Sequence, residues 1–254
     1  MKKPFIAFNW KCNPSSNALV LELLKASDRE GSVVFPSFVD LSEAGKKLRK
    51  ASLGAQDLFV SGGAYTGEVS PKMLKRLGVS YVLVGHSERR SFIGEADYLV
   101  REKMESALLS GLRPILCIGE TADERAAGIG EEIIERQFLS GTEKISPELL
   151  KKIIVAYEPV WAISTGTVGT AASPEDASRA AMFIKRLAMD INIPNVSVLY
   201  GGSASSANAA GFLSAREVDG LLIGGASLKP LEVKAILDIA FKGTDKKKNK
   251  NGKK

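Results

Sequence analysis

The only histidine of this 254-residue chain, His86, is a candidate for acid–base chemistry because of its position. It closes the run Tyr81-Val82-Leu83-Val84-Gly85 and begins the polar segment His86-Ser87-Glu88-Arg89-Arg90. A lone imidazole excludes paired-histidine metal sites and C2H2 zinc fingers, because both need more than one histidine. If His86 has a chemical task, it acts as an acid, a base or a hydrogen-bond donor. The alternative is a buried or solvated histidine without a task.

Further polar residues and glycines end other apolar runs along the chain. In chain order they are Asn9 and Lys11, then Glu120, then Glu158, then Gly201-Gly202-Ser203, and finally Gly224-Gly225. Residues two apart in extended backbone point the same way, so an amide and an ammonium, those of Asn9 and Lys11, would share one face. Glu158 lies between Tyr157 and Pro159, at the mouth of an apolar wall. A carboxylate removed from water there is a stronger base than one in water.

The two glycine pairs indicate a place for an anion. Without side chains, the backbone at Gly201-Gly202 and Gly224-Gly225 can approach an oxyanion closely. We expect the segments after these pairs to begin helices, whose first N–H groups favour a phosphate. Double glycines alone remain a weak signal.

Eight apolar runs recur along the chain and predict strands. They span residues 5–8, 33–35, 53–56 (the weakest), 81–84, 115–118, 153–157, 196–200 and 221–223. Apolar residues at helical spacing stand in most of the intervals, such as Leu19, Leu23 and Leu24, then Leu99, Met104 and Leu108, then Ala181, Ile184, Leu187 and Ala188, and then Val233, Ile236, Leu237 and Ala240. Alternating strands and helices predict a parallel sheet with right-handed crossovers. Nearly continuous apolar runs are typical of strands buried on both faces.

Eight such units favour an α/β protein with a (β/α)8 barrel as its single domain, over residues 1–241. The chain length is close to the about 250 residues typical of this fold. A doubly wound sheet has the same local pattern and remains the rival. In a barrel the C-terminal strand ends meet at one mouth, so the candidate residues would collect there.

Composition narrows the class of protein further. With 44% apolar and 25% charged residues and no apolar stretch near the about 18 residues of a membrane span, we expect a soluble, cytoplasmic protein. The two cysteines, Cys12 and Cys117, are far apart and form no CxxC motif, so we expect reduced thiols and no metal site.

The net charge of +6 lies entirely in the last residues. Residues 242–254 carry seven lysines and one aspartate and nothing apolar enough to bury, so we expect a disordered basic tail. Such a tail binds polyanions weakly. We predict no specific nucleic-acid partner and no membrane partner for it.

Five separated segments resemble the signature segments of the triosephosphate isomerase family, in the family's order and spacing. They are Asn9-Trp10-Lys11, Gly85-His86-Ser87-Glu88-Arg89-Arg90, Tyr157-Glu158-Pro159-Val160-Trp161-Ala162-Ile163, Tyr200-Gly201-Gly202-Ser203 and Gly224-Gly225-Ala226-Ser227-Leu228. The resemblance runs from about residue 5 to about 241. It implies a TIM barrel and an enzyme of glycolysis and gluconeogenesis that interconverts dihydroxyacetone phosphate and D-glyceraldehyde 3-phosphate without a cofactor or metal.

The resemblance also implies the roles of the site residues, and this family is a worked case of acid–base tuning. Glu158 would be the base, a neutral His86 the electrophile, and Lys11 and Asn9 the rest of the oxyanion environment. Main-chain N–H groups near Ser164, Ser203, Gly224 and Gly225 would bind the substrate phosphate, with Lys11 and Asn9 close by. Glu88 would act with Lys11, and Glu120 and Tyr157 would support the lid.

Two long loops take their roles from the same resemblance. The loop from Pro159 to Pro174 would be the closing lid, but it carries Ser164 where the family usually has glycine, and its stretch 167–173 looks longer than usual. If residue 164 needs a positive φ, serine costs about 1 kcal/mol there. We therefore expect the reaction type to be kept and the turnover or phosphate affinity to be reduced. The loop from Phe59 to Pro71 would be an arm that places Thr66 near Asn9 of the partner subunit in a homodimer.

Three other functions compete with this one. One is a barrel isomerase for a larger sugar phosphate, which the compact loops disfavour. Another is a binding or scaffold protein that keeps the barrel with a disabled lid and uses the lysine tail as its contact surface. A dehydrogenase is disfavoured because its nearest glycine motif, Gly128-Ile129-Gly130, follows helical sequence and not a strand.

Overall fold

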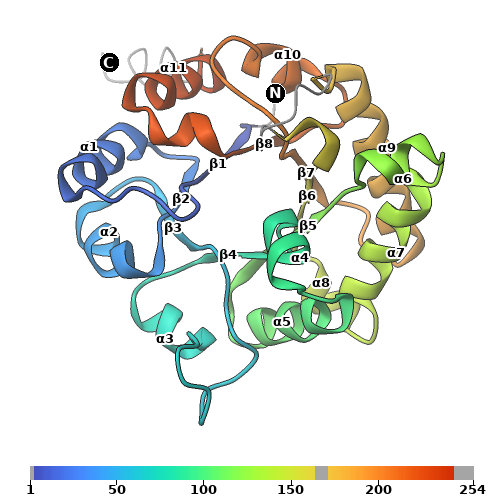
Figure 1. Cartoon of the computed structure of the whole chain (residues 1–254), viewed down its shortest axis with the longest axis horizontal. Helices are drawn as coiled ribbons and strands as arrows, with labels where there is room; N and C mark the ends of the chain where they lie inside the picture. The colour runs from blue at the N-terminus through green and yellow to red at the C-terminus, as the bar shows by residue number, and fades with distance from the viewer. Residues whose placement is uncertain (1–2, 164–170, 243–254) are drawn as a thin grey trace, which may run out of the picture.

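In a computed structural model, which describes residues 3–163 and 171–242, eight parallel strands close into a barrel (Figure 1). The strands are β1 (Phe5–Asn9), β2 (Ser32–Phe35), β3 (Ser52–Ala55), β4 (Tyr81–Val84), β5 (Arg113–Ile118), β6 (Ile154–Tyr157), β7 (Ser197–Tyr200) and β8 (Gly220–Ile223). They follow one another around the barrel in sequence order, and β8 pairs with β1. The prediction of a (β/α)8 barrel is confirmed, and the doubly wound sheet is excluded because the sheet has no open edge.

Helices surround the strands on the outside (Figure 1). The α-helices are α1 (Asn17–Ser27), α2 (Leu41–Lys47), α3 (Pro71–Arg76), α4 (Ser87–Ile93), α5 (Asp97–Leu109), α6 (Ala122–Ala126), α7 (Gly130–Thr142), α8 (Pro147–Leu150), α9 (Pro174–Asp190), α10 (Ala209–Ser214) and α11 (Pro230–Ala240). Short 3₁₀ helices are η1 (Phe38–Asp40), η2 (Val160–Ala162) and η3 (Gly225–Leu228). The four stretches of helical spacing noted in the sequence correspond to α1, α5, α9 and α11.

The alternation of side chains along each strand builds two separate cores. In β1, Ile6 and Phe8 belong to the large cluster between strands and helices, whereas Ala7 belongs to a smaller cluster inside the barrel. Val33 and Phe35 of β2 also belong to the inner cluster. Burial on both faces explains why these strands read as continuous apolar runs.

The weakest strand signal, that of β3, has a packing cause. A Cβ added at Gly54 would lie 2.3 Å from the Phe35 ring. The large Phe35 side chain therefore fills the barrel at a level where β3 can contribute no side chain. A glycine in a strand lowers its apparent propensity, although here it is required by close packing.

Asp28, just after α1, joins two loops. Its Oδ1 accepts hydrogen bonds from the backbone N–H groups of Arg49 (3.0 Å), Lys50 (2.7 Å) and Ala51 (2.9 Å). Burial by itself raises the pKa of this carboxyl, but the backbone donors outweigh burial and hold the pKa below its usual value of 3.8. A lowered pKa means that the charged form stabilises the fold above the unfolded-state pKa and loses this effect as the pH falls through the folded-state pKa.

We expect Asp28→Asn to lower the free energy of unfolding by about 1 kcal/mol at neutral pH, because hydrogen bonds to a charged, partly exposed acceptor become bonds to a neutral one. Urea titrations at neutral pH and at successively lower pH measure this. The difference between the two proteins should shrink as the pH falls through the lowered pKa of Asp28. An equal difference at all pH values would contradict the electrostatic origin.

The last helix, α11, closes the barrel domain. The predicted domain boundary at residue 241 lies just beyond the end of this helix, and the predicted tail lies outside the described residues from position 243 on. None of the helices in the described ranges combines the length and the apolar character that crossing a membrane requires. Cys12 and Cys117 are free thiols, the first exposed and the second buried.

Candidate active site

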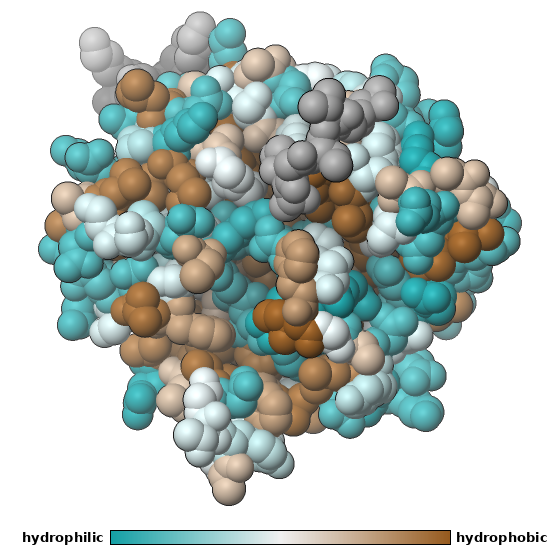
Figure 2. Space-filling view, in the orientation of Figure 1, coloured by the Kyte–Doolittle hydropathy of each residue, from teal (hydrophilic) through white to brown (hydrophobic). Residues whose placement is uncertain are grey.

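A cavity of about 540 Å³ lies where the C-terminal ends of the strands meet, and it collects most of the predicted site residues. Its lining includes Asn9, Lys11, His86, Gly201, Gly202, Ser203, Gly224 and Gly225. Figure 2, in the orientation of Figure 1, shows hydrophilic residues near the centre of this face with hydrophobic residues beside them. Residues from strand ends far apart in the sequence are therefore brought to one place.

Lys11 is positioned by its backbone in a way that the sequence did not indicate. Its φ of 57° lies in the left-handed region, so β1 ends at Asn9 and the expected extended backbone does not continue to Lys11. The Asn9 Oδ1 accepts the Lys11 N–H at 2.9 Å, and the Gln56 amide donates to the Lys11 carbonyl at 2.8 Å. Two side chains thus hold an unfavourable backbone conformation, as is common at functional sites.

The Lys11 ammonium is paired with a carboxylate at the edge of the cavity. Its Nζ lies 2.5 Å from Oε1 of Glu88, which is the second residue of α4. Glu88 thus contacts Lys11, the residue with which the resemblance pairs it. An anion bound in the cavity would meet an ammonium that is already held in position.

The two ring nitrogens of His86 have different hydrogen-bonding roles. It is the N-cap of α4, and its Nδ1 accepts the Glu88 backbone N–H at 3.2 Å. A nitrogen that accepts a hydrogen bond carries no proton, so the proton of the neutral imidazole resides on Nε2. The side chain is 10% exposed. His86 is therefore arranged as a hydrogen-bond donor through Nε2.

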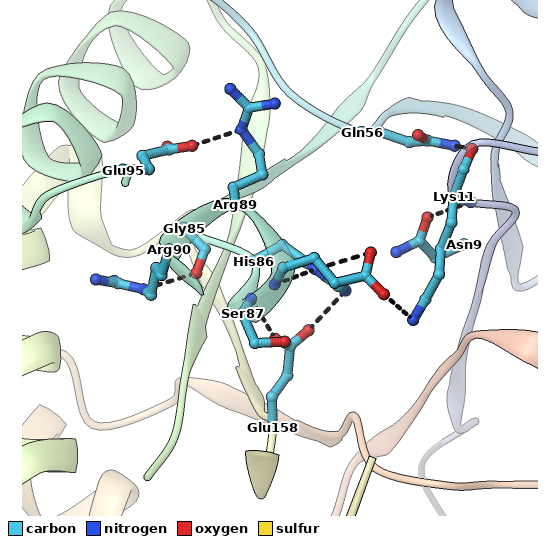
Figure 3. Close-up of polar contacts among 11 residues, drawn as sticks. Asn9, Lys11, Gln56, Gly85, His86, Ser87, Arg89, Arg90, Glu95 and Glu158 are labelled. Carbon is cyan, nitrogen blue, oxygen red and sulfur yellow. Dashed lines mark hydrogen bonds and ion pairs between the residues drawn. The ribbon is translucent and has the colours of Figure 1, made fainter. Parts of the chain in front are cut away.

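The carboxylate of Glu158 faces this nitrogen. Glu158 is 1% exposed, its Oε2 accepts the Ser87 backbone N–H at 2.8 Å, and its Oε1 lies 3.2 Å from His86 Nε2 (Figure 3). Despite this short distance, Oε1 accepts no hydrogen bond from any described residue. A buried carboxylate oxygen without a donor is available to take a proton.

A second cavity, of about 370 Å³, is lined by Glu158, Ser87 and Cys117. Burial, and next the neighbouring Glu158 carboxylate, raise the pKa of the Cys117 thiol well above its usual value. Cys117 therefore stays protonated at neutral pH, which makes it a poor nucleophile and metal ligand.

Glu120 and Tyr157 fix the start of the loop after Glu158. The Glu120 Oε1 accepts from the Tyr157 hydroxyl at 2.9 Å and from the Trp161 indole N–H at 2.7 Å. Burial, together with the Glu120 carboxylate, raises the pKa of Tyr157, so this hydroxyl remains a donor. Arg125 stacks over the Trp161 ring at 4.0 Å. Glu120 therefore contacts the first turn of this loop through Trp161, and the Tyr157 hydroxyl contacts Glu120.

The two glycine pairs lead into different backbone structures. Gly225 begins η3, which agrees with the expectation of a helix start, but after Gly201-Gly202 the next helix begins only at Ala209. The expectation is therefore wrong for the first pair, where turns intervene. Ser203 donates its hydroxyl to the Ala162 carbonyl at 2.8 Å, which ties it to the loop after β6. Ser164 lies outside the described residues.

Two residues that position the site were missed in the sequence. Gln56 directly follows β3 and donates to the carbonyls of Lys11 and Phe35, and the rule of polar residues after apolar runs would have found it. Ser87 contributes only its backbone N–H, which leaves no signal in the sequence. Among the residues that the structure describes, no group of three or more potential ligand side chains is placed to hold a metal ion.

The chain is similar to known proteins over nearly its whole length. The family model described as triosephosphate isomerase matches residues 4–240. A protein named triosephosphate isomerase from Dictyoglomus thermophilum is 42% identical over 243 residues, which cover 91% of this chain and 96% of the relative. One from Delftia acidovorans is 41% identical over 252 residues, covering 94% and 100%. The glycosomal triosephosphate isomerase of Trypanosoma cruzi is 39% identical over 246 residues, covering 92% and 96%.

A barrel whose mouth brings the His86 imidazole within 3.2 Å of the buried Glu158 carboxylate, in a chain so similar to these relatives over nearly its whole length, leaves one assignment: the chain belongs to the triosephosphate isomerase family and is an isomerase.

Proposed function

We propose that this isomerase interconverts dihydroxyacetone phosphate and D-glyceraldehyde 3-phosphate through an enediolate, with Glu158 as the base and His86 as the electrophile. The observation that carries the proposal is the pair of unlike groups 3.2 Å apart: a carboxylate oxygen of Glu158 without a hydrogen bond and the Nε2 of His86, whose Nδ1 accepts the Glu88 N–H. Such a pair can remove a proton from carbon while it donates to the adjacent oxygen.

The steps balance without a cofactor. Glu158 takes a proton from C1 of the ketose, the C–H electron pair becomes the C1–C2 double bond, and the carbonyl electrons move onto O2. His86 Nε2–H donates to O2, and the imidazole then relays a proton between O1 and O2. Glu158 returns its proton to C2, which gives the aldehyde at C1. The product has the same atoms and the same charge as the substrate.

Lys11 and Asn9 would stabilise the charge that develops on the oxygens. Both line the larger cavity beside His86, and the ammonium of Lys11 is held in place by Glu88 before substrate arrives. Preorganised donors are effective because they need no reorientation when the charge forms. Glu158 lines the second cavity and not the larger one, so its carboxylate must turn away from the Ser87 N–H to reach the substrate carbon.

The phosphate would bind at the opposite wall of the larger cavity. Ser203, Gly224 and Gly225 line it, and Gly225 is the first residue of η3. A phosphate site formed by the loops after strands 7 and 8 and a short extra helix recurs in barrels of this type. Lys11 would add a full positive charge.

A coupled assay tests the proposal directly. Purified protein is given dihydroxyacetone phosphate, and the aldehyde formed is followed through a dehydrogenase; fructose 6-phosphate serves as the larger ketose phosphate. We expect rapid turnover of the triose and none of the hexose. Turnover of the hexose alone would favour an isomerase for larger sugar phosphates, and turnover of neither would favour a binding protein.

The serine at position 164 bears on the catalytic efficiency of the enzyme. We propose that it lowers catalytic efficiency, because the family usually has glycine there; if position 164 needs a positive φ, an L-residue costs about 1 kcal/mol. Ser164→Gly is therefore expected to raise kcat/KM several-fold, by roughly the factor of 5 that 1 kcal/mol represents. Steady-state kinetics of both proteins measure this, and an unchanged or lower kcat/KM would show that the loop has adapted to serine.

We also propose a homodimer assembled through the arm between β3 and α3. Residues 61–68 are all exposed, and this loop projects away from the barrel at the bottom of Figure 1. The ring of Tyr65 packs on Phe59 at 4.5 Å, which gives the arm a defined base. In the dimer, Thr66 would approach Asn9 of the partner subunit.

Sedimentation velocity is expected to give a dimer at micromolar concentration. Thr66→Arg should shift the protein toward the monomer and lower kcat, since a bulky charge at the arm's tip cannot be accommodated beside a neighbouring active site. A wild-type monomer at micromolar concentration would contradict the dimer.

A further inference from the structure

The peptide that carries His86 leaves β4 through a turn that requires glycine. Gly85 has a φ of 72°, in the left-handed region that favours glycine. A Cβ at this position would lie 2.9 Å from Arg90 Nη2 and 3.1 Å from a methyl group of Val100. The guanidinium of Arg90 therefore lies directly against the backbone that turns from the strand to His86.

Arg90 contacts both residues of this turn. Its Nε donates to the Gly85 carbonyl at 2.8 Å, and its backbone N–H donates to the His86 carbonyl at 3.1 Å. Figure 3 shows the side chain folded back toward Gly85, away from the cavity residues Lys11 and Asn9. Arg90 lines the second cavity and is absent from the lining of the larger one, so it is not placed to touch a ligand there.

The guanidinium of Arg90 is in turn bound by a residue of the helical layer outside the barrel. Its Nη1 lies 2.5 Å from Oδ1 of Asp97, the first residue of α5. The other oxygen of Asp97 lies 3.5 Å from Nε of Arg136 in α7. A chain of charged groups thus connects two helices to the Gly85 carbonyl.

The Gly85 carbonyl belongs to the peptide that joins Gly85 to His86. Rotation of this peptide changes the φ of His86 and swings its Cα–Cβ bond, which moves the imidazole. The ring itself has a 3.2 Å hydrogen bond from the Glu88 N–H to Nδ1, and its Nε2 lies 3.2 Å from Oε1 of Glu158. A misplacement of about 1 Å in a catalytic group costs about 100-fold in rate.

From these contacts we propose that Arg90, anchored by Asp97, is a positioning residue that sets the orientation of the His86 imidazole through the Gly85 carbonyl. The proposal rests on the catalytic role proposed for His86. Arg90 acts through another residue and touches no reacting atom.

The first test combines kinetics with the signal of a unique nucleus. Because the chain has a single histidine, ¹⁵N labelling of histidine gives the Nδ1 and Nε2 resonances of His86 without assignment. In Arg90→Gln we expect kcat to fall about 10- to 100-fold with KM within about 2-fold, and both imidazole resonances to move. A role in stability alone would lower the melting temperature without moving these resonances in the folded protein.

Three further variants test the same proposal. Arg90→Lys keeps the charge but lacks the planar fork, so it should recover only part of kcat. Asp97→Asn should move the resonances in the same direction, and it serves as the second test if Arg90→Gln fails to fold. Arg101→Gln is the matched control, because Arg101 is an arginine of α5 paired only with Glu105 among the contacts described, and it should leave kcat and the resonances unchanged.

Added guanidinium ion supplies the last readout. In Arg90→Ala, millimolar guanidinium is expected to raise kcat several-fold by refilling the vacated position, with no such effect on the wild type. The proposal is overturned if the imidazole resonances of Arg90→Gln and Asp97→Asn coincide with those of the wild type, or if kcat is unchanged. If the wild type lacks isomerase activity, the proposed function fails, while the resonances still report whether Arg90 orients His86.

Discussion

Glu158→Gln is expected to lower kcat about 10³- to 10⁴-fold and to leave the protein folded. The loss follows from removing the group that takes the proton from carbon, since general acid–base catalysis contributes up to about 10⁴-fold. KM should change little, because Glu158 does not line the larger cavity, where the phosphate would bind. The same coupled assay measures both constants.

The fold should tolerate this change for a structural reason. Glutamine has the same shape as glutamate, and its carbonyl oxygen can still accept the Ser87 N–H that Glu158 Oε2 accepts at 2.8 Å. The substitution also removes a charge that is 1% exposed, and a buried charge is costly to keep. We therefore expect a melting temperature within a few degrees of the wild type, so that the lost rate cannot be attributed to unfolding.

Glu158→Asp is the matched control. It keeps the carboxylate but withdraws it by one methylene group, which moves the base by more than 1 Å. An intermediate loss of about 10²-fold is expected from this misplacement. If Glu158→Gln keeps more than a tenth of the wild-type kcat, another group is the base and the proposed mechanism is wrong.

The residues that the sequence could indicate are those whose side chains end a buried strand. Asn9, His86, Glu120 and Glu158 each follow an apolar run, and the parallel barrel brings strand ends of this kind together. Burial on both faces makes these runs continuous, so the strands could be located to within about two residues. Burial of the strands thus indicates both the fold and the end of the barrel at which the candidate residues lie.

The features that the sequence could not indicate depend on backbone groups and on packing between distant segments. The proton position on His86 follows from a backbone N–H of Glu88, and the Oε2 of Glu158 is held by a backbone N–H of Ser87. Every residue except proline has such a group, so no residue type marks it. The left-handed backbone conformation of Lys11 likewise cannot be predicted from the sequence, because lysine shows no preference for that conformation.

Gln56 is a different case, since its position could have been found. It follows β3, the strand with the weakest signal, and this weakness comes from Gly54 making room for the Phe35 ring. A glycine at a barrel-facing position interrupts the run of apolar residues by which a strand is recognised in the sequence. The polar residue at its end then loses the context that would mark it.

Lys11→Met is the second substitution with a large expected effect. Methionine is also unbranched and of similar length, so the positive φ of 57° costs it about as much as it costs lysine. The change therefore removes the charge with little effect on the backbone. Removing one member of a hydrogen-bonded charge contact with a bound anion costs about 2–5 kcal/mol, which corresponds to roughly 30- to 5000-fold in kcat/KM.

The loss in kcat/KM for Lys11→Met should come from both a higher KM and a lower kcat, whereas Glu158→Gln should lower kcat alone. A phosphate is charged before and after the reaction, so its attraction to Lys11 is lost in the ground state and KM rises. The enediolate is charged only during the reaction, so kcat falls as well. The inhibition constant of inorganic phosphate isolates the first effect, because phosphate carries no reacting carbon.

Glu88→Gln provides the control for position as opposed to charge. It keeps the ammonium but replaces the carboxylate that lies 2.5 Å from Nζ by a neutral amide, so the ammonium is held less firmly before substrate binds. We expect kcat to fall while phosphate inhibition stays close to that of the wild type, since a mobile ammonium can still reach a bound dianion.

If Lys11→Met leaves both phosphate inhibition and kcat unchanged, the positive charge serves neither the phosphate nor the oxyanion. The cavity would then have to bind its substrate through main-chain N–H groups alone, and the affinity would lose the dependence on ionic strength that a full charge gives.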